Sequence, residues 1–211
     1  MTNFIPIFPL GIVAYPGEEL NLHIFEERYK QLMSECFAEN KPFGIPVVIN
    51  NKVMDFGTLV KVSEVIEVYN DGKMDIRTKG IGIFRMLEII KQVPDKLFSG
   101  AIVTHQQNYT RTTKDLMPAI MVGVRELHKL LNIAKQFKKP DEDLTSYDIA
   151  HHAGMNVEEE YQMLQLMRED QRQEYLKRHL AKVIPIVAGM DALKEKVKLN
   201  GHFRDLKGFE F

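Results

Sequence analysis

FPLGIVAYPGEELNLHIFEERY, residues 8–29, is the stretch of this 211-residue chain that indicates most about its fold. Pro9 and Pro16 interrupt its apolar part at a spacing that a helix interior cannot hold, so short extended pieces are expected. The Pro-Gly pair at Pro16 predicts a turn. Leu20 and Leu22 then alternate with polar residues, as in a half-buried strand.

The next residues change to a helical period, over 26–40. Apolar residues recur at spacings of 3, 1, 3 and 1, which places them on one stripe of an amphipathic helix: Tyr29, Leu32, Met33, Cys36 and Phe37. Asn40 and Pro42 mark the end of this helix.

Residues 44–106 are rich in β-branched residues and predict a mostly antiparallel sheet. The Asp-Gly pair within residues 70–73 separates two alternating runs, 65–69 and 74–78, and predicts a β-hairpin. Further strands are expected over 44–49, 58–62, 83–90 and 97–104. The two glycines of Gly80-Ile81-Gly82 predict a tight bend between two of these strands.

The second half of the chain has helical periodicity. We expect a helix over 114–137, a charged loop over 135–143, a short helix over 147–153 opened by a Thr145–Asp148 capping box, and a helix from 157 to about 180 capped by Asn156. Pro185 predicts an interruption of any helix beyond it, and the end from residue 200 is aperiodic. Strands succeeded by helices predict an α+β fold, with a β domain over 1–107 and a helical domain over 108–211.

Composition narrows the class of protein. With 28 Lys+Arg against 29 Asp+Glu the formal charge is −1, so no electrostatic footprint for nucleic acid is evident. The single cysteine, Cys36, excludes an intramolecular disulfide and a multi-cysteine zinc site. No apolar run reaches the length of a spanning helix and no leader pattern opens the chain. We therefore expect a cytoplasmic protein with no membrane association.

No catalytic constellation is visible in the sequence. There is no phosphate-binding loop and no G-x-S-x-G elbow, and His151 and His152 are adjacent, so they point about 100° apart on a helix. Cys36 lies on the apolar stripe, where a buried, inert thiol is expected. The remaining candidate nucleophiles are Ser34, Ser63 and Ser99. We expect no enzyme activity, no metal and no cofactor.

Several motifs, in order and over residues 4–105, resemble the N-terminal domain of Lon proteases, also called the LON substrate-binding domain. The residues that carry this resemblance are Phe8-Pro9-Leu10, Tyr15-Pro16-Gly17, His23-Ile24-Phe25-Glu26-Glu27-Arg28-Tyr29, Phe43-Gly44-Ile45-Pro46-Val47-Val48, Phe56-Gly57-Thr58-Leu59-Val60-Lys61-Val62, Asn70-Asp71-Gly72 and Thr78-Lys79-Gly80-Ile81-Gly82-Ile83-Phe84-Arg85. The sequence departs from the family pattern at Glu27, where a proline is usual, and at Arg85, which comes after Phe84 instead of preceding a phenylalanine.

The resemblance implies a PUA-like pseudo-barrel β domain with one early helix, and then a helical bundle. Lon proteases continue into an ATPase module and a Ser-Lys protease module, and this sequence contains neither. The resemblance therefore implies a stand-alone form that does not itself carry out ATP-driven proteolysis.

Five residues at the expected strand-to-helix corner have two interpretations: Phe25, Glu26, Glu27, Arg28 and Tyr29. The resemblance implies that this corner engages substrate polypeptide. The residues themselves also fit a supporting role, in which Phe25 staples the helix to the sheet, Glu26 and Glu27 favour the helix dipole, Arg28 pairs with a carboxylate and Tyr29 starts the apolar stripe.

The expected function is a non-catalytic module that binds unfolded or client protein segments. Two alternatives remain open: a PUA-like module for a small ligand or RNA, and an accessory subunit of a protease or chaperone supplied in trans. A cryptic hydrolase is a further alternative, for which no activity is expected. The sequence gives no indication of the client or the oligomeric state.

Overall fold

The computed structural model describes residues 2–111 and 116–205, with only the backbone described for residue 2 and for residues 191–205. The chain divides into two compact units. The first comprises the described residues of Met1–Thr112 together with Met155–Arg172, and the second comprises those of Thr113–Gly154 and Gln173–Phe211.

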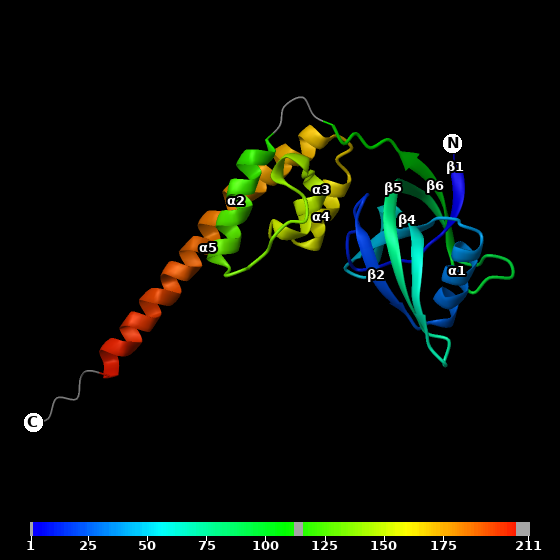
Figure 1. The fold of residues 1–211 in the computed structure, drawn as a ribbon, viewed down its shortest axis with the longest axis horizontal. Helices are drawn as coiled ribbons and strands as arrows, with labels where there is room; N and C mark the ends of the chain where they lie inside the picture. The colour runs from blue at the N-terminus through cyan, green and yellow to red at the C-terminus, as the bar shows by residue number, and fades with distance from the viewer. Residues whose placement is uncertain (1, 112–115, 206–211) are drawn as a thin grey trace, which may run out of the picture. The chain divides into compact units, whose positions relative to one another are not determined.

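The first unit is built on an antiparallel sheet (Figure 1). Its elements are β1 (Thr2–Pro6), β2 (Glu19–Ile24), α1 (Glu27–Ala38), β3 (Phe43–Ile49), β4 (Lys52–Val68), β5 (Met74–Ile90), β6 (Gly100–Gln106) and α4 (Val157–Leu164). The strand order is β1-β6-β5-β4-β3, and β2 pairs with β5 outside this path.

The long strand β5 organises this sheet. Its first part pairs with β2, its second part pairs with β6, and β4 runs along much of its length. Residues beyond β1 close the sheet by pairing in parallel with β3 at Ile7–Gly44 and Leu10–Val47. The result is the predicted α+β fold with a pseudo-barrel, one early helix and a helical region after it.

The β4–β5 hairpin confirms the sequence prediction. The Tyr69 N–H donates to the Lys73 oxygen at 2.8 Å, and Gly72 turns the chain with a φ of 77°. The separately predicted strands over 58–62 and 65–69 are one strand, and those over 74–78 and 83–90 are another.

The predicted bend at Gly80-Ile81-Gly82 is wrong, because these residues lie inside β5. The Gly80 N–H donates to the Glu18 oxygen at 2.8 Å, and the Gly80 oxygen accepts from Gly17 N–H at 2.9 Å. A Cβ at Gly80 would collide with the Tyr15 oxygen. Glycine is needed here for close approach of the Tyr15–Glu18 turn, not for bending the strand.

Helix α1 covers the larger of two apolar clusters in this unit. Its residues Leu32, Met33 and Cys36 are buried against side chains of β2 to β5 and of the flanking loops. The helix ends as predicted at Asn40, whose φ of 51° lets the Lys41 N–H donate to the Cys36 oxygen at 2.9 Å. This is a Schellman-type ending. The second cluster contains Ile5, Ile7, Leu59, Phe84, Met86, Ala101 and Val103.

Residues 155–172 return to the sheet unit. Asn156 and Glu159 form the predicted capping box at the start of α4, with the Glu159 N–H donating to Asn156 Oδ1 at 2.9 Å. The Phe56 N–H donates to the Tyr161 hydroxyl at 3.2 Å, which ties α4 to β4. The helix ends at Leu164, where the sequence predicted one continuous helix to about residue 180. The division into domains over 1–107 and 108–211 stays a prediction.

The second unit is helical. Its elements are α2 (Met117–Leu130), the 3₁₀ turn η1 (Asp141–Asp143), α3 (Ser146–Ile149), the 3₁₀ turn η2 (Ala150–His152) and α5 (Glu169–Asp205), which begins in the first unit. The apolar face of α2 is buried, and Gly123 lets α5 approach closely, since a Cβ there would lie 3.3 Å from Leu180 Cδ1. The predicted capping box is present, with the Thr145 N–H donating to Asp148 Oδ2 at 2.8 Å.

Helix α5 differs from the prediction at Pro185, which does not interrupt it. Proline removes one N–H donor and strains the preceding turn, and α5 keeps its helical course through this exposed position. The start of the predicted helix at residues 114–115 and the end of the chain at 206–211 lie outside the described residues.

Candidate polypeptide-binding site

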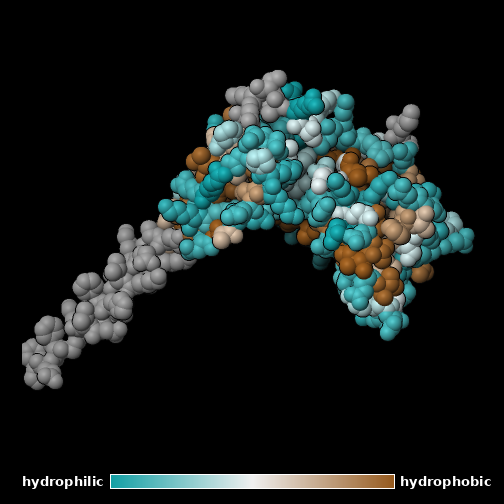
Figure 2. Space-filling view, viewed as in Figure 1, coloured by the Kyte–Doolittle hydropathy of each residue, from teal (hydrophilic) through white to brown (hydrophobic). Residues whose placement is uncertain are grey.

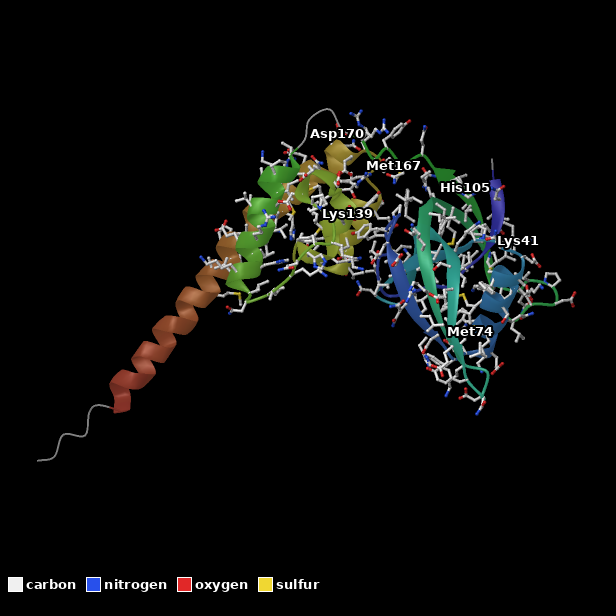
Figure 3. The ribbon with its side chains drawn as sticks, in the orientation of Figure 1. Lys41, Met74, His105, Lys139, Met167 and Asp170 are labelled. Atoms are coloured by element: carbon white, nitrogen blue, oxygen red, sulfur yellow. The ribbon has the colours of Figure 1, made fainter. Side chains whose placement is uncertain are left out.

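The corner between β2 and α1 brings the five predicted site residues together. Strand β2 alternates exposed and partly buried residues until Ile24, which is buried against the core, and the chain then turns at Phe25. Glu26 occupies the N-cap with extended backbone (φ −78°, ψ 135°), and α1 starts at Glu27. Met74, the strand partner of Ile24, is labelled in Figure 3 near the hairpin end of the sheet.

Phe25 is the exposed residue of the corner. Its side chain is 59% exposed, and its ring lies 6.2 Å from the ring of His23 in a stacked arrangement. The prediction that Phe25 staples α1 to the sheet is therefore wrong. The position four residues into the helix, where a staple needs an apolar partner, is Lys30.

Glu26 and Arg28 satisfy each other. Arg28 Nη2 donates to Glu26 Oε2 at 2.6 Å and Arg28 Nε donates to the same oxygen at 2.9 Å. The Glu26 side chain makes no capping hydrogen bond to the helix. The Arg28 guanidinium also lies 4.6 Å from the centre of the Tyr29 ring. These contacts hold the charged side chains close to the corner, where the pair remains partly exposed.

Tyr29 and Glu27 have different environments. The Tyr29 ring packs edge-on against Phe8 at 4.4 Å and joins the core cluster, and this burial raises its pKa. Glu27 lies in the first turn of α1, with its side chain 77% exposed, and its Oε1 accepts from Lys30 Nζ at 2.8 Å. Lys30 also donates to the Asp71 oxygen at 3.0 Å, which fastens α1 to the β4–β5 turn.

A polar cluster beside Phe25 was not predicted from the sequence. His23 Nδ1 lies 2.6 Å from Asp75 Oδ1, and the Tyr69 hydroxyl donates to Asp75 Oδ2 at 2.6 Å. The hydrogen bond to Asp75 raises the pKa of Tyr69 to about 12, and the same bond, with the one to His23, lowers the pKa of Asp75. His23 and Asp75 meet only through the pairing of β2 with β5, so no local sequence signal could have revealed them.

Apolar surface lies close to this corner. Figure 2 shows apolar patches over the part of the sheet that ends in the β4–β5 hairpin. The exposed apolar residues of this end include Ile66, Val68 and Tyr69, which are 48%, 63% and 37% exposed. A folded, isolated chain gains nothing from exposing them, so they offer contact area to a partner.

The candidate nucleophiles have no catalytic setting in the described part of the chain. The Ser63 hydroxyl donates to the Arg77 oxygen and the Ser99 hydroxyl to the Lys91 oxygen, at 3.0 Å in each case. Burial, together with Glu35 and Glu39, raises the pKa of the Cys36 thiol to about 11. Ser34 lines a shallow depression on α1.

The described residues offer neither a metal site nor a membrane span. Residues 2–111 and 116–205 contain no group of three or more His, Cys, Asp or Glu side chains placed to hold a metal ion. Among the described helices, none combines the length and apolar character that crossing a bilayer requires.

A family model described as the ATP-dependent protease La (LON) substrate-binding domain matches residues 5–182. The chain belongs to this family. The match covers both the sheet unit and most of the described helices, so this LON substrate-binding domain includes the helical region that the sequence motifs did not identify. The family supports a role in substrate recognition.

Solved structures agree on the fold of this LON domain. The Lon N-terminal domain protein from Xanthomonas campestris is 23% identical, with a TM-score of 0.61, over 82% of this chain and 96% of that chain. The N-terminal domain of the Mycobacterium avium complex Lon protease is 11% identical, with a TM-score of 0.60, over 85% of this chain and 99% of that chain. No curated protein sequence matches the chain.

Proposed function

We propose that this LON domain is a non-catalytic module that binds exposed apolar segments of client polypeptides at the corner formed by Phe25, Glu26, Glu27, Arg28 and Tyr29. Processing of a bound client would then need a protease or chaperone partner supplied in trans. The family model that matches describes a substrate-binding domain, which fits such a division of labour.

The observation that carries this proposal is the exposure of Phe25. A phenylalanine held at a fixed corner between a strand and a helix offers a large apolar surface at little entropic cost, because the backbone around it is already ordered. Fully burying a side chain of this size contributes about 1.5–3 kcal/mol. Phe25 is therefore the residue of the corner from which a client gains most.

The other four residues support or surround this contact. Tyr29 is anchored in the core, and Arg28 is held by Glu26, so these three residues fix the shape of the corner. The Glu27 side chain is more exposed than those of Glu26 and Arg28, and it lies in the first turn of α1. We expect it to favour clients that carry a basic residue near their apolar side chains.

Binding of a reduced, carboxymethylated unfolded protein, measured by fluorescence anisotropy, tests this proposal. Phe25→Ala should weaken binding about ten-fold, since removing a buried aromatic contact changes affinity by roughly this amount. Phe37→Ala is the matched control, because Phe37 is also an exposed phenylalanine of this unit (49%) and lies near the other end of α1.

Equal effects of the two substitutions would show that exposed apolar area in general, and not this corner, captures the client. Absence of binding to the wild-type protein, with folding verified by circular dichroism, would remove the proposal.

A further inference from the structure

Strand β2 has one unpaired edge. It pairs with β5 in a regular antiparallel ladder from Glu19–Lys79 to Ile24–Met74, without a register shift. Within residues 2–111 and 116–205, no other strand pairs with β2.

The direction in which its backbone groups point can be deduced from the bonds that anchor the ladder. The Gly80 N–H donates to the Glu18 oxygen, and the Thr78 hydroxyl donates to the Leu20 oxygen at 3.1 Å. Because backbone groups of an antiparallel strand face alternate sides, the even-numbered residues of β2 face β5. The N–H and C=O groups of Glu19, Asn21 and His23 therefore face the open side.

This edge lacks the features by which natural proteins protect an edge strand. Its ladder contains no bulge, no proline lies within it, and no charged side chain points inward. Glu19, Asn21 and His23 are exposed on the outer face. On the inner face, Leu20 and Leu22 are only partly buried while packing against the core cluster. An added strand would complete both the hydrogen bonding and the burial.

We infer that the open edge of β2 receives an extended client segment as an additional strand, an inference that rests on the proposed function and specifies its binding mode. The occupant is a polypeptide in which apolar and polar residues alternate, because apolar side chains must lie beside Leu20 and Leu22 while the intervening ones face water. Glu19 makes no ion pair within the described residues, so a basic residue opposite it is favoured. Phe25 comes directly at the end of the strand, where the same segment reaches it.

Substitutions at Asn21 test the backbone contact from the protein side. Asn21→Pro removes the N–H at the centre of the open edge and leaves the ladder to β5 intact, since proline is tolerated where the N–H faces away from the sheet. Asn21→Ala is the matched control, which loses the same side chain and keeps the N–H. We expect Asn21→Pro to bind an alternating Val/Thr peptide with a terminal lysine about ten-fold more weakly than Asn21→Ala.

Peptide N-methylation tests the same contact from the client side and does not depend on how a protein variant folds. Methylating the amides of the valines blocks one edge of the peptide strand, and methylating those of the threonines blocks the other. One of the two methylated peptides should lose binding to the wild-type protein and the other should keep it. Which one fails reports whether the added strand is parallel or antiparallel to β2.

The outcomes separate this inference from the proposed function. If both methylated peptides bind like the parent peptide, or if the parent peptide does not bind at all, strand addition is wrong. The corner site survives either result as long as the unfolded protein binds and Phe25→Ala weakens that binding. Equal binding by the two Asn21 variants, with both folded, would also overturn strand addition.

Discussion

At the scale of single residues, burial decides which chemistry is available to neighbouring side chains of one helix. Cys36 and Phe37 are consecutive in α1, yet Cys36 is 4% exposed and Phe37 is 49% exposed. A thiol enclosed by apolar side chains and flanked by Glu35 and Glu39 resists ionisation, so it is a packing group and not a nucleophile.

The raised pKa of Cys36 predicts slow thiol chemistry in the folded protein. A change in pKa from 9.0 to about 11 lowers the thiolate fraction near pH 8 roughly hundred-fold. Ellman's reagent should therefore react far more slowly with the native chain than with the chain in denaturant. Because the folded pKa is raised, the stability that the neutral thiol contributes is complete below about pH 9 and is lost as the pH rises towards 11.

Rapid reaction of the native protein at neutral pH would contradict this assignment. As the chain has one cysteine, the reaction needs no further assignment to a residue.

At the scale of elements, β5 shows why a glycine pair in a sequence does not by itself indicate a bend. Gly80 lies where the Tyr15–Glu18 turn contacts the strand backbone, whereas the nearest atom to a Cβ at Gly82 is Leu59 Cδ1 at 4.0 Å. The two glycines of one short motif therefore have different requirements. Only the first is enforced by a backbone neighbour that cannot move away.

Alanine substitutions at the two glycines should have opposite outcomes. Gly80→Ala should lower the free energy of unfolding by about 1–3 kcal/mol, because its Cβ would overlap the Tyr15 oxygen and force the turn away. Gly82→Ala should be neutral or slightly stabilising, since alanine reduces the entropy of the unfolded chain without meeting a neighbour. Urea unfolding monitored by circular dichroism measures both changes, and equal destabilisation would show that the strand itself rejects a side chain.

At the scale of the whole molecule, Arg172 ties two distant segments of the sheet unit together. Its guanidinium is fully buried and pairs with Glu169 at 2.8 Å, donates to the Asn108 side chain at 3.0 Å and donates to the Tyr109 oxygen at 3.1 Å. The Tyr109 N–H in turn donates to the Met167 oxygen at 2.8 Å. This network fastens the return of the chain after α4 to the segment just beyond β6.

Arg172 and Arg168 form a matched pair for testing this network. Each makes an ion pair of 2.8 Å, but the Arg172–Glu169 pair is buried and the Arg168–Asp170 pair is exposed. Arg172→Ala should lower the free energy of unfolding by about 3–5 kcal/mol, because it leaves a buried carboxylate without its partner. Arg168→Ala should change it little, since water replaces an exposed partner. Similar effects in chemical denaturation would rule out a structural role for the buried network.

Local patterns in the sequence determined the parts of this protein that depend on neighbouring residues. The alternation of residues 74–78, the Asp-Gly turn before them, the Asn40 ending of α1 and the capping boxes at Thr145 and Asn156 are all present as predicted. Each is set by dihedral preferences or hydrogen bonds within a few residues. The Asn50-Asn51 turn between β3 and β4, with φ of 50° and 60°, was missed, although two adjacent asparagines are a signal for such a turn.

Tertiary structure alone decided which residues of the corner are exposed and which strand edge stays open. The sequence placed Phe25 beside a helix start, but its exposure depends on Lys30 occupying the position where an apolar partner would have covered it. The His23–Asp75–Tyr69 cluster and the open side of β2 exist only because β2 pairs with β5, more than fifty positions away for His23 and Asp75. Such pairings depend on the global path of the chain, which the spacing of nearby residues does not encode.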